Sequence, residues 1–269
     1  GGDLLGNLWR FDFRSATAAV PAPLLFATLK DAANVVQPIT TLPLIEYAVG
    51  DSKRYVFVGT GRFLDTADIA NAQQQTFYAI RDGSIGQRFE TTASATGEVL
   101  PSGVTFPITR ADLFNHSDLS TTSNLAIGLT SAQIASKPMG WYYDLGGFAP
   151  LTGTVLSRER ISLNPKASQG FVTWVGNVPE TNACNPNGVS RQYATTYGGG
   201  KSLLYTEVAG VRTYRSYTET RALVKSQLVN VGDGVRILGT DDKGEPFLIG
   251  NPLNSFGSGR LLNWREILQ

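Results

Sequence analysis

The chain has 269 residues and a net charge of +1, and its content of 42% hydrophobic and 10% aromatic residues excludes an intrinsically disordered protein. Its 29 glycines, 13 prolines and only 17% charged residues favour short strands joined by tight turns over a helical bundle. The near-neutral charge argues against a protein that coats nucleic acid, and the single His and single Cys exclude an intrachain disulfide and a His-rich or Cys-rich zinc site.

The length fits one large all-β domain, and no apolar run approaches the roughly 18 residues of a membrane span. No signal peptide is visible, but the only methionine is Met139. We therefore expect the natural start of the protein to lie upstream of Gly1, so that the first residues carry no information about the compartment.

The first predicted element is a turn followed by a strand, in the sequence GDLLGNLWRFD at 2–12. Asp3 can cap the turn, and Gly6 tolerates the positive φ that a tight turn requires. Trp9 and Phe11 alternate with other residues along the strand, so period-2 geometry places both aromatic side chains on one face. We expect this face to be core, and the strand to pair with a first hairpin strand upstream of the chain.

Further strands are predicted where β-branched and aromatic residues gather between turn residues. They cover residues 24–29, 54–59, 76–81, 140–145, 159–163 and 170–175. Two hairpins are predicted after them, one formed by 202–208 with 212–217 and one by 235–238 with 246–249.

The segments between these strands give weaker signals. We expect a loop with one helical turn at 61–75 and a loop at 177–191. The stretch 84–139 is rich in Thr, Ser and Ala, and within it 110–114 is predicted as a short helix or a strand. Because strand pairs recur without regular helices between them, the pattern excludes βαβ units and favours a sandwich, a barrel or a propeller with long insertions.

Two glycine-rich stretches superficially resemble phosphate-binding loops. VGTGR at 58–62 lacks the third glycine of a dinucleotide loop, because Leu64 occupies that position. YGGGKS at 197–202 lacks the first glycine of a P-loop, because Thr195 stands there, and Ser202 leads into a predicted strand. We interpret both stretches as turns that need glycine.

The single His and the single Cys are the remaining candidates for reactive side chains. His116 lies in the polar segment FNHSD at 114–118, where we expect an exposed loop residue without the oriented partner that catalysis requires. Cys184 also lies in a predicted loop. It is either a free thiol or pairs with a cysteine outside this chain, and an oxidising compartment favours the second.

The carboxylates do not converge on a recognisable site. Asp241, Asp242 and Glu245 form the densest group, but DDKGE lacks the alternating oxygen ligands of a calcium loop and is better interpreted as a hairpin turn. A calcium site inside this chain would have to use these three residues. The 16 Arg against 7 Lys indicate structural ion pairs. We assign no catalytic, cofactor-binding or metal-binding residue within the chain.

Seven short motifs follow one another along nearly the whole chain. They are GDLLGNLWRFD at 2–12, PIT at 38–40, VFVGTGRFL at 56–64, QTFYAIRD at 75–82, GWYYDL at 140–145, NACNPNG at 182–188 and NWRE at 263–266. In this set and order the chain resembles the C-terminal domain of the PilY family, called PilC in some lineages, which comprises type IV pilus assembly and tip-associated proteins. The motifs cover 84–130 and 203–250 least.

The resemblance implies an all-β fold, a modified β-propeller with long loop insertions. Residues 1–269 would be the C-terminal portion of that domain and would start in the middle of a blade. The resemblance also implies a calcium site in an Asp-rich loop before Gly1, so its ligands would lie outside this chain, and we do not transfer the site to Asp3. The family's variable, adhesin-like N-terminal region would lie outside as well.

The resemblance further implies a non-enzymatic protein of the bacterial cell surface and pilus tip, exported through the periplasm. It would regulate pilus extension against retraction and support twitching motility and surface adhesion. The implied partners are minor pilins, the upstream part of the same protein, and a host or abiotic surface. No nucleic acid and no membrane span are expected.

Two other classes of function are open from the sequence. A quinoprotein-like propeller enzyme would share the Gly-Asp turn before a Trp-containing strand, but it would need a ring of cofactor contacts, and no regular Trp-docking repeat is present. A stand-alone surface adhesin or lectin would use long loops such as 84–139 and 176–200. A cofactor absorption spectrum and a glycan-binding screen would distinguish these alternatives.

Overall fold

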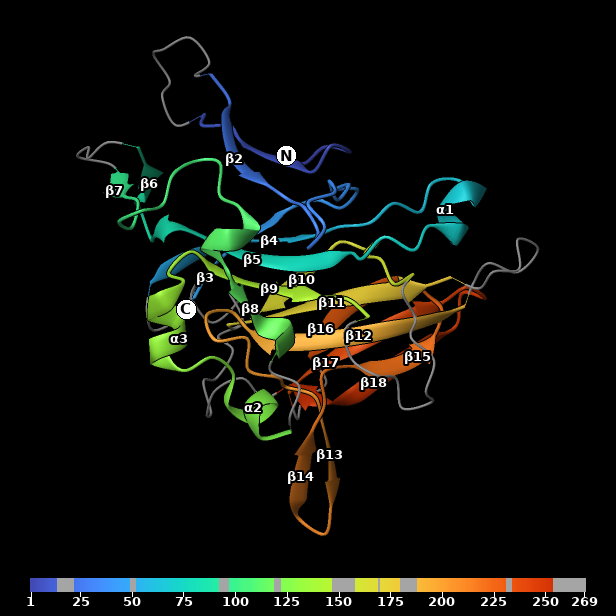
Figure 1. The fold of residues 1–269 in the computed structure, drawn as a ribbon. Coiled ribbons are helices and arrows are strands. Elements are labelled where there is room, and N and C mark those ends of the chain that lie inside the picture. The colour runs from blue at the N-terminus through green and yellow to red at the C-terminus, as the bar shows by residue number, and fades with distance from the viewer. Residues whose placement is uncertain are drawn as a thin grey trace, which may run out of the picture.

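The computed structural model describes residues 1–13, 22–48, 52–91, 97–118, 122–146, 158–168, 170–179, 188–230 and 234–253 (Figure 1). Within these ranges strands dominate, and the helices are short. The prediction of an all-β fold is therefore confirmed.

The central layer is a five-stranded sheet in the order β3-β4-β5-β9-β8. Its strands are β3 (Leu44–Tyr47), β4 (Lys53–Gly59), β5 (Thr76–Ser84), β8 (Phe114–Asn115) and β9 (Gly140–Asp144). Neighbouring strands are antiparallel except β8 and β9, which run parallel. The strands predicted at 54–59, 76–81 and 140–145 are β4, β5 and β9, which lie in the interior of this sheet.

Two further antiparallel sheets come from the C-terminal half of the chain. One has the order β10-β11-β12-β15 and the other the order β16-β17-β18. The first consists of β10 (Lys166–Ser168), β11 (Phe171–Val178), β12 (Val189–Thr196) and β15 (Thr218–Arg221). The second consists of β16 (Leu223–Asn230), β17 (Val235–Asp241) and β18 (Pro246–Leu253).

Three two-stranded sheets and several short helices complete the described part. The two-stranded sheets are β1 (Asn7–Arg10) with β2 (Leu24–Thr28), β6 (Arg88–Glu90) with β7 (Gly97–Val99), and β13 (Tyr205–Val208) with β14 (Val211–Tyr214). The helices are α1 (Thr66–Ala70), α2 (Thr122–Ile127), α3 (Ser131–Ser136) and the 3-10 turns η1 (Arg110–Asp112) and η2 (His116–Asp118). None of the helices in the described ranges is long and apolar enough to cross a bilayer.

The main sheets are stacked face to face in the order in which the chain forms them (Figure 1). One apolar cluster joins the β1-β2 pair to the five-stranded sheet, for example through Leu8 and Val58. A second joins the five-stranded to the four-stranded sheet, and a third joins the four-stranded sheet to β16-β17-β18. Successive antiparallel sheets packed in this way have the arrangement of neighbouring propeller blades.

Aromatic rings fill the interface between the five-stranded and four-stranded sheets. The rings of Phe77 and Trp174 are stacked with centroids 4.0 Å apart, and Trp174 stacks in turn on Tyr193 at 4.9 Å. Phe57 extends the stack from β4 at 6.2 Å from Phe77. Each of these side chains is at most 1% exposed, so a large apolar area is removed from water at this interface.

Strand β5 has both of its faces buried. Phe77 and Ala79 point into the aromatic interface, whereas Tyr78 and Ile80 belong to the cluster beneath β1 and β2. All four side chains are inaccessible to solvent. Burial on both faces explains why residues 77–80 are all large or apolar, in contrast to the alternating pattern of a half-exposed strand.

The structure corrects two predictions about elements and adds three strands that were not predicted. Residues 159–163 were expected to form a strand, but they make only an isolated bridge between Arg160 and Asn177. The loop predicted at 177–191 is shorter than expected, because β11 continues to Val178 and β12 begins at Val189. The strands β12, β15 and β16 were not predicted as such, since their polar residues hide the periodicity.

The predicted core face of the opening strand is also wrong. Leu8 is 2% exposed and packs beneath β2, whereas Phe11 is 47% exposed. Trp9 is half-buried, and its indole Nε1 donates to Asp3 Oδ2 at 3.2 Å. The strand pairs with β2 on one edge, and on the other Gly2 bridges Leu8 across the turn that Asp3 caps. The aliphatic side chain is therefore the core anchor.

We expect Leu8→Ala to lower the free energy of unfolding by about 2–5 kcal/mol, the usual range for truncating a buried leucine. Phe11→Ala removes a larger but exposed side chain and should change it by less than about 0.5 kcal/mol. Urea denaturation followed by tryptophan fluorescence measures both. A larger loss for Phe11→Ala than for Leu8→Ala would restore the aromatic face as the core.

Candidate functional site

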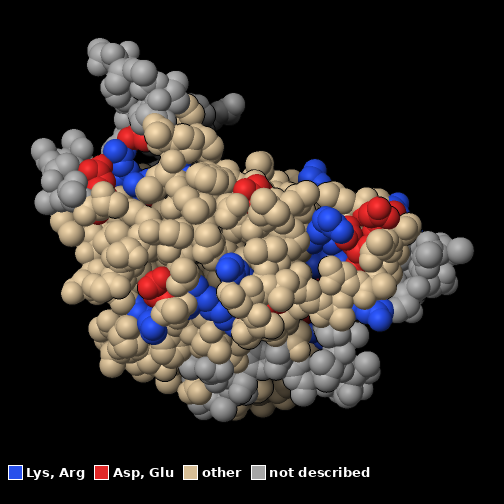
Figure 2. Space-filling model, turned by 45° about the horizontal axis from the view of Figure 1, so that its top comes forward, with Lys and Arg blue, Asp and Glu red and all other residues tan. Residues whose placement is uncertain are grey.

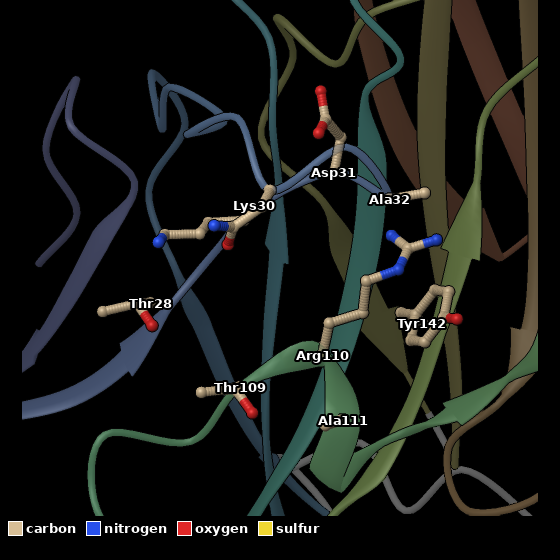
Figure 3. Close-up of a pocket in the computed structure, with 9 residues that line it drawn as sticks. Thr28, Lys30, Asp31, Ala32, Thr109, Arg110, Ala111 and Tyr142 are labelled. Atoms are coloured by element: carbon tan, nitrogen blue, oxygen red, sulfur yellow. The ribbon is translucent and has the colours of Figure 1, made fainter.

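A hollow of about 560 Å³ opens between the end of β2, the turn that follows it, η1 and β9 (Figure 3). Its lining residues are Thr28, Lys30, Asp31, Ala32, Asn34, Thr109, Arg110, Ala111 and Tyr142. β2 and the segment before η1 are held together by backbone hydrogen bonds, Thr28 N to Ile108 O and Ile108 N to Phe26 O. The walls of this groove are thus fixed by the same bonds that attach β2 to the body. We call this hollow the β2–η1 groove.

A continuous chain of hydrogen bonds between buried side chains lies behind the lining residues of the groove. The Tyr78 hydroxyl donates to Gln37 Oε1 at 2.6 Å, and Gln37 Nε2 donates to Thr76 Oγ1 at 2.8 Å. Thr76 Oγ1 then donates to Asp144 Oδ1 at 2.8 Å. Tyr78, Gln37 and Thr76 are fully buried, and in such surroundings a polar group is stable only when it is bonded.

Arg110 connects this buried chain of hydrogen bonds to the groove. Its two Nη atoms donate to the two carboxylate oxygens of Asp144, and the guanidinium carbon lies 3.9 Å from the centre of the Tyr142 ring. Burial lowers the pKa of Arg110, but the hydrogen bonds and charge of Asp144 outweigh it, so the net pKa is raised. A guanidinium held on one side by a carboxylate and on one face by a ring is fixed in orientation. We call Tyr78, Gln37, Thr76, Asp144 and Arg110 the Asp144 network.

The opposite wall of the groove is the tight turn at residues 31–35. Asp31 Oδ1 accepts from the backbone N–H groups of Ala33 and Val35, both at 2.9 Å, and its Oδ2 accepts from Gln73 Nε2 at 3.1 Å. One carboxylate oxygen of Asp31 is therefore bonded within the turn and the other to Gln73. Lys30, in contrast, is half-buried and makes no ion pair within the part of the chain that the structure describes.

Several ion pairs elsewhere confirm that arginine serves structure in this protein. Asp82 binds Arg10 at 2.6 Å and Arg54 at 3.0 Å. Glu159 accepts from Arg191 Nη1 at 2.9 Å and from the Tyr193 hydroxyl at 2.6 Å, with both charged side chains at most 1% exposed. Figure 2 accordingly shows basic and acidic atoms mostly in mixed clusters, separated by broad uncharged surface.

Glu159 is held against a glycine. A Cβ atom on Gly176 would lie 1.9 Å from Glu159 Oε1, so the backbone of β11 can approach the carboxylate only because this position has no side chain. Burial raises the pKa of Glu159, while Arg191 and Tyr193 act in the opposite direction. The segment predicted as a strand at 159–163 is therefore a buried connection that carries a charge into the core.

The structure corrects the predicted exposure of His116. Its ring is 1% exposed and packs against Trp141 and Tyr143 at centroid distances of 5.1 and 5.9 Å. Gly200 lies directly against the imidazole, where a Cβ would come within 2.4 Å of Nε2. Burial lowers the pKa of His116 from 6.5 to about 4, so the ring is neutral near pH 7. A packed His that bridges β9 and the glycine turn is a structural residue.

The two glycine-rich stretches are turns, as the motif counts indicated. β4 ends at Gly59, which packs on Ile161, and Gly61 adopts a φ of 129°. Gly200 adopts a φ of 60° in the turn between β12 and Ser202. Neither stretch opens a helix, and a phosphate loop needs the N-terminus of one.

The acidic turn at 241–245 closes the β17-β18 hairpin, as predicted. Asp241 Oδ1 accepts from the backbone N–H groups of Lys243 at 3.0 Å and Glu245 at 2.8 Å, and its Oδ2 pairs with Arg221 at 2.9 Å. Within the described ranges, no three His, Cys, Asp or Glu side chains converge as metal ligands. Cys184 and the motif at 263–266 lie outside the described residues.

The β2–η1 groove was not indicated by the sequence. Lys30 and Arg110 are far apart in the chain, and no spacing rule connects them. The one available signal was the excess of Arg over Lys, which indicated fixed guanidinium groups without locating them. The groove is lined by both charged and neutral polar side chains, with Lys30 making no ion pair to the residues that the structure describes.

Burial of a neutral His116 makes the stability depend on pH. The imidazole of His116 has a pKa of about 4 in the folded protein, compared with about 6.5 in the unfolded chain. The stabilisation is therefore complete above about pH 6.5 and is lost as the pH falls towards 4, by about 3 kcal/mol in total. Urea titrations across this range measure it.

The matched variant is His116→Leu, which keeps an apolar side chain in the site. Several aspartates also titrate in acid, so the informative quantity is the difference between the two proteins. We expect the stability of His116→Leu relative to the parent protein to rise as the pH falls from 6.5 to 4. Parallel pH profiles would show that His116 is solvated.

Buried and exposed ion pairs should respond differently to truncation. Glu159→Ala leaves Arg191 buried without its partner and should cost about 3–5 kcal/mol of unfolding free energy. Glu207→Ala removes the partner of Arg212, an exposed pair at 2.8 Å, and should leave the urea midpoint nearly unchanged. Equal effects would contradict the burial of Glu159.

Comparison with known proteins identifies relatives and one solved structure that this chain resembles. No family model matches the chain. A type IV pilus biogenesis factor PilY1 homolog from Xylella fastidiosa is 42% identical over 81 residues, which are 30% of this chain and 6% of the relative. The type IV pilus biogenesis factor PilY1 of Pseudomonas aeruginosa is 25% identical over 288 aligned residues, 91% of this chain and 23% of the relative. The chain thus spans less than a quarter of the length of either relative.

Among solved structures, the crystal structure of the Pseudomonas aeruginosa PilY1 C-terminal domain resembles this fold with a TM-score of 0.61 and 23% sequence identity. The match covers 93% of this chain and 56% of that chain. It confirms the predicted fold, a modified β-propeller domain. The resemblance to the C-terminal domain of the PilY family, first indicated by seven ordered motifs, is thereby confirmed.

Proposed function

We propose that this chain is part of a type IV pilus biogenesis protein and acts by binding other proteins of the pilus, without catalysing a reaction. The observation that carries the proposal is the likeness to PilY1, which extends over 91% of the chain in sequence and 93% in structure. Both relatives compared above are named as type IV pilus biogenesis factors.

The architecture supports a role in binding. Stacked antiparallel sheets with an aromatic interface form a rigid body, and loops and turns project from it as contact surfaces. The polar side chains of the Asp144 network are bonded to one another, and His116 is packed among aromatic rings. In both places the polar groups serve packing, and a rigid, inert body suits a protein that is pulled as a pilus retracts.

The finer parts of the proposal concern partners and place. We propose minor pilins, the upstream part of the same protein and a host or abiotic surface as partners, at the pilus tip on the cell surface after export through the periplasm. The domain would regulate pilus extension against retraction and support twitching motility. Its match to 56% of the solved domain supports the proposal that it is a portion of a longer propeller.

We further propose that any calcium bound by the full-length protein is held outside this chain, upstream of Gly1. In the described part, the acidic turn that would compete for calcium is already engaged, because Asp241 bonds two backbone N–H groups and Arg221. Calorimetry with this chain alone tests the proposal, and a micromolar calcium site would overturn it.

Deleting residues 1–269 from the full-length protein in its native bacterium should reduce surface pili and twitching motility. Blocking retraction in the same strain should restore at least some pili, because the proposed defect lies in the balance of extension and retraction. Electron microscopy and the yield of sheared pilin measure the number of surface pili, and a stab-agar assay measures twitching motility. Unchanged piliation, motility and adhesion after deletion would contradict the pilus role.

Point variants separate folding from surface function in that experiment. Changes to core residues such as Phe57, Tyr78 or Trp174 should reproduce the deletion, because all three are at most 1% exposed. His116 is buried and cannot serve as the neutral control that its polar neighbourhood suggested. Lys243→Gln, at an exposed position of the β17-β18 turn, is the appropriate control.

A further inference from the structure

The β13-β14 hairpin projects from the body of the protein. Figure 1 shows it extending away from the stacked sheets, at the lower end of the view. Its base is fixed, because Leu204 is 3% exposed in the apolar cluster beside β16-β17-β18 and its carbonyl accepts from Arg215 N at 2.9 Å. The Ser202 hydroxyl also donates to Arg215 O at 2.5 Å. The hairpin is therefore a defined element held away from the core.

A tight turn sets the hydrogen-bond pattern of the hairpin. Ala209 and Gly210 form a two-residue loop with φ values of 51° and 80°, and a type I′ turn has positive φ at both of these positions. In such a hairpin the pair next to the loop exchanges both backbone hydrogen bonds, and bonded and non-bonded pairs alternate along the strands. The next pair is Glu207 and Arg212. Their backbone N–H and C=O groups therefore point to the two outer edges.

One face of the hairpin makes its contacts internally. Tyr205 lies opposite Tyr214 with ring centroids 5.7 Å apart, and the Arg212 guanidinium carbon lies 4.4 Å from the centre of the Tyr205 ring. Arg212 also pairs with Glu207 at 2.8 Å, and these two are the only charged residues of 205–214. Cross-strand pairs of this kind hold a hairpin in its shape, and here they leave it without an unpaired charge.

The opposite face of the hairpin carries only β-branched side chains, Thr206, Val208, Val211 and Thr213, and all four are exposed. Val208 is 75% and Val211 is 68% exposed, and no other large hydrophobic residue in the described ranges is as exposed as Val208. β-branched side chains are favoured in strands because they pack well against neighbours on a sheet surface. This face is therefore suited to packing against another surface.

Both outer edges of the hairpin are open. In the described ranges β13 and β14 have only each other as neighbouring strands. Exposed edges are usually protected by Lys, Pro or a bulge, but residues 205–214 contain neither Lys nor Pro, and the register of the pair is regular. A two-stranded sheet is also only marginally stable by itself, so a third strand would stabilise it. An unprotected edge of this kind is a template for an added strand.

We propose that the β13-β14 hairpin is a docking arm that accepts an extended, uncharged segment of another polypeptide as a third strand along one outer edge. The segment would bond the outward backbone groups of Glu207 or Arg212, and its apolar side chains would cover Val208 and Val211. The proposal deepens the proposed pilus function and rests on it only for the source of the partner.

The chemistry of the hairpin selects this occupant over others. Its two charged side chains are paired with each other, so nothing in the hairpin attracts a nucleic acid or a free anion. The valines beside the loop are too few to hold a protein on a bilayer, where even a whole acyl chain binds only marginally and reversibly. Open backbone donors and acceptors are instead matched by another strand.

The binding test uses the purified full-length protein and a blocked, fluorescein-labelled peptide, STVTVTVS, which has alternating β-branched residues and no charged side chain. The control peptide carries N-methyl groups on two neighbouring central residues, so it keeps its side chains but loses a donor on each edge. Fluorescence anisotropy should show the unmodified peptide binding at least about tenfold more tightly than the control. Equal binding of the two peptides, or no binding of the unmodified one, would overturn the proposal.

Proline variants locate the docking edge. Glu207→Pro removes an N–H that the hairpin itself does not use, and it should weaken the peptide about tenfold if β13 carries the edge. Arg212→Pro tests β14 in the same way. Glu207→Gln and Arg212→Gln are the matched controls, because they lose the same ion pair but keep the N–H. If neither proline variant binds more weakly than its glutamine control, strand addition is wrong.

Amide hydrogen exchange of the parent protein gives a measurement that needs no variant. The amide of Glu207 or Arg212 points outward and should exchange readily in the free protein, then become protected when the unmodified peptide is added. The amides of Thr206 and Thr213, which bond each other inside the hairpin, show whether each proline variant keeps the hairpin intact. Binding of the peptide without protection of either outward amide would overturn the proposal.

Two other occupants are tested with the same proteins. Analytical ultracentrifugation tests for a second copy of the chain, and flotation with phosphatidylcholine and phosphatidylglycerol vesicles tests for a membrane. A parent protein that stays monomeric and does not float supports the proposal. Self-association that Glu207→Pro or Arg212→Pro abolishes, or vesicle binding that Val208→Ser abolishes, would overturn it.

The docking arm and the pilus role fail separately. Equal binding of the two peptides overturns the docking arm, whether or not deletion of residues 1–269 abolishes pili. Unchanged piliation, motility and adhesion after that deletion overturn the pilus role, while the peptide assay still decides the docking arm.

Discussion

The register of β5 is the constraint on which the rest of the structure depends. Phe77 on one face of this strand stacks on Trp174, while Thr76 and Tyr78 on the other face belong to the Asp144 network behind the β2–η1 groove. A slip of one residue would exchange the two faces, placing a phenylalanine in the polar network and a threonine in the aromatic interface. The aromatic stack and the Asp144 network therefore specify each other across one strand.

The groove inherits its rigidity from this arrangement. β9 carries Trp141 and Tyr143 into the aromatic interface, so Tyr142 faces the groove and supports Arg110. Asp144 ends the same strand and fixes the guanidinium from beneath. A surface arginine is ordinarily a flexible side chain, but here two core layers determine its position. The polar network adds specificity, because each of its buried members is stable only with its partners in place.

Sequence patterns located the strands whose burial follows hydrophobicity. β4, β5, β9 and β11 were predicted, because aromatic and β-branched residues dominate them. β12 was missed, since Arg191 and Gln192 look like solvent-facing residues although both are fully buried by pairing. His116 was placed in solvent for the same reason. Pattern arguments assume that polar side chains face water. This assumption fails for Arg191 and Gln192, which are bonded inside the protein, and for His116, whose ring packs among aromatic side chains.

The groove itself could not have been predicted without the fold. Its cations come from the turn after β2 and from η1, two segments that hydrogen bonds between β2 and Ile108 bring together. The opening strand shows a second limit of sequence patterns. Alternation along the strand correctly indicated two different faces, but it did not show which face is buried in the core. Aromatic size suggested Trp9 and Phe11, whereas the packing of β2 above the central sheet selected Leu8.

The contact between Gly176 and Glu159 restricts how this sequence can change through evolution. Any side chain at position 176 would occupy the space of the carboxylate, so that position is open to substitution only after Glu159 has become smaller. Loss of the Glu159 carboxylate would leave the Arg191 guanidinium and the Tyr193 hydroxyl buried in the core without this hydrogen-bond acceptor. A single substitution at position 159, 176, 191 or 193 is therefore expected to be destabilising. Among related sequences, substitutions at these positions should occur together, as a block that is either kept or exchanged as a whole.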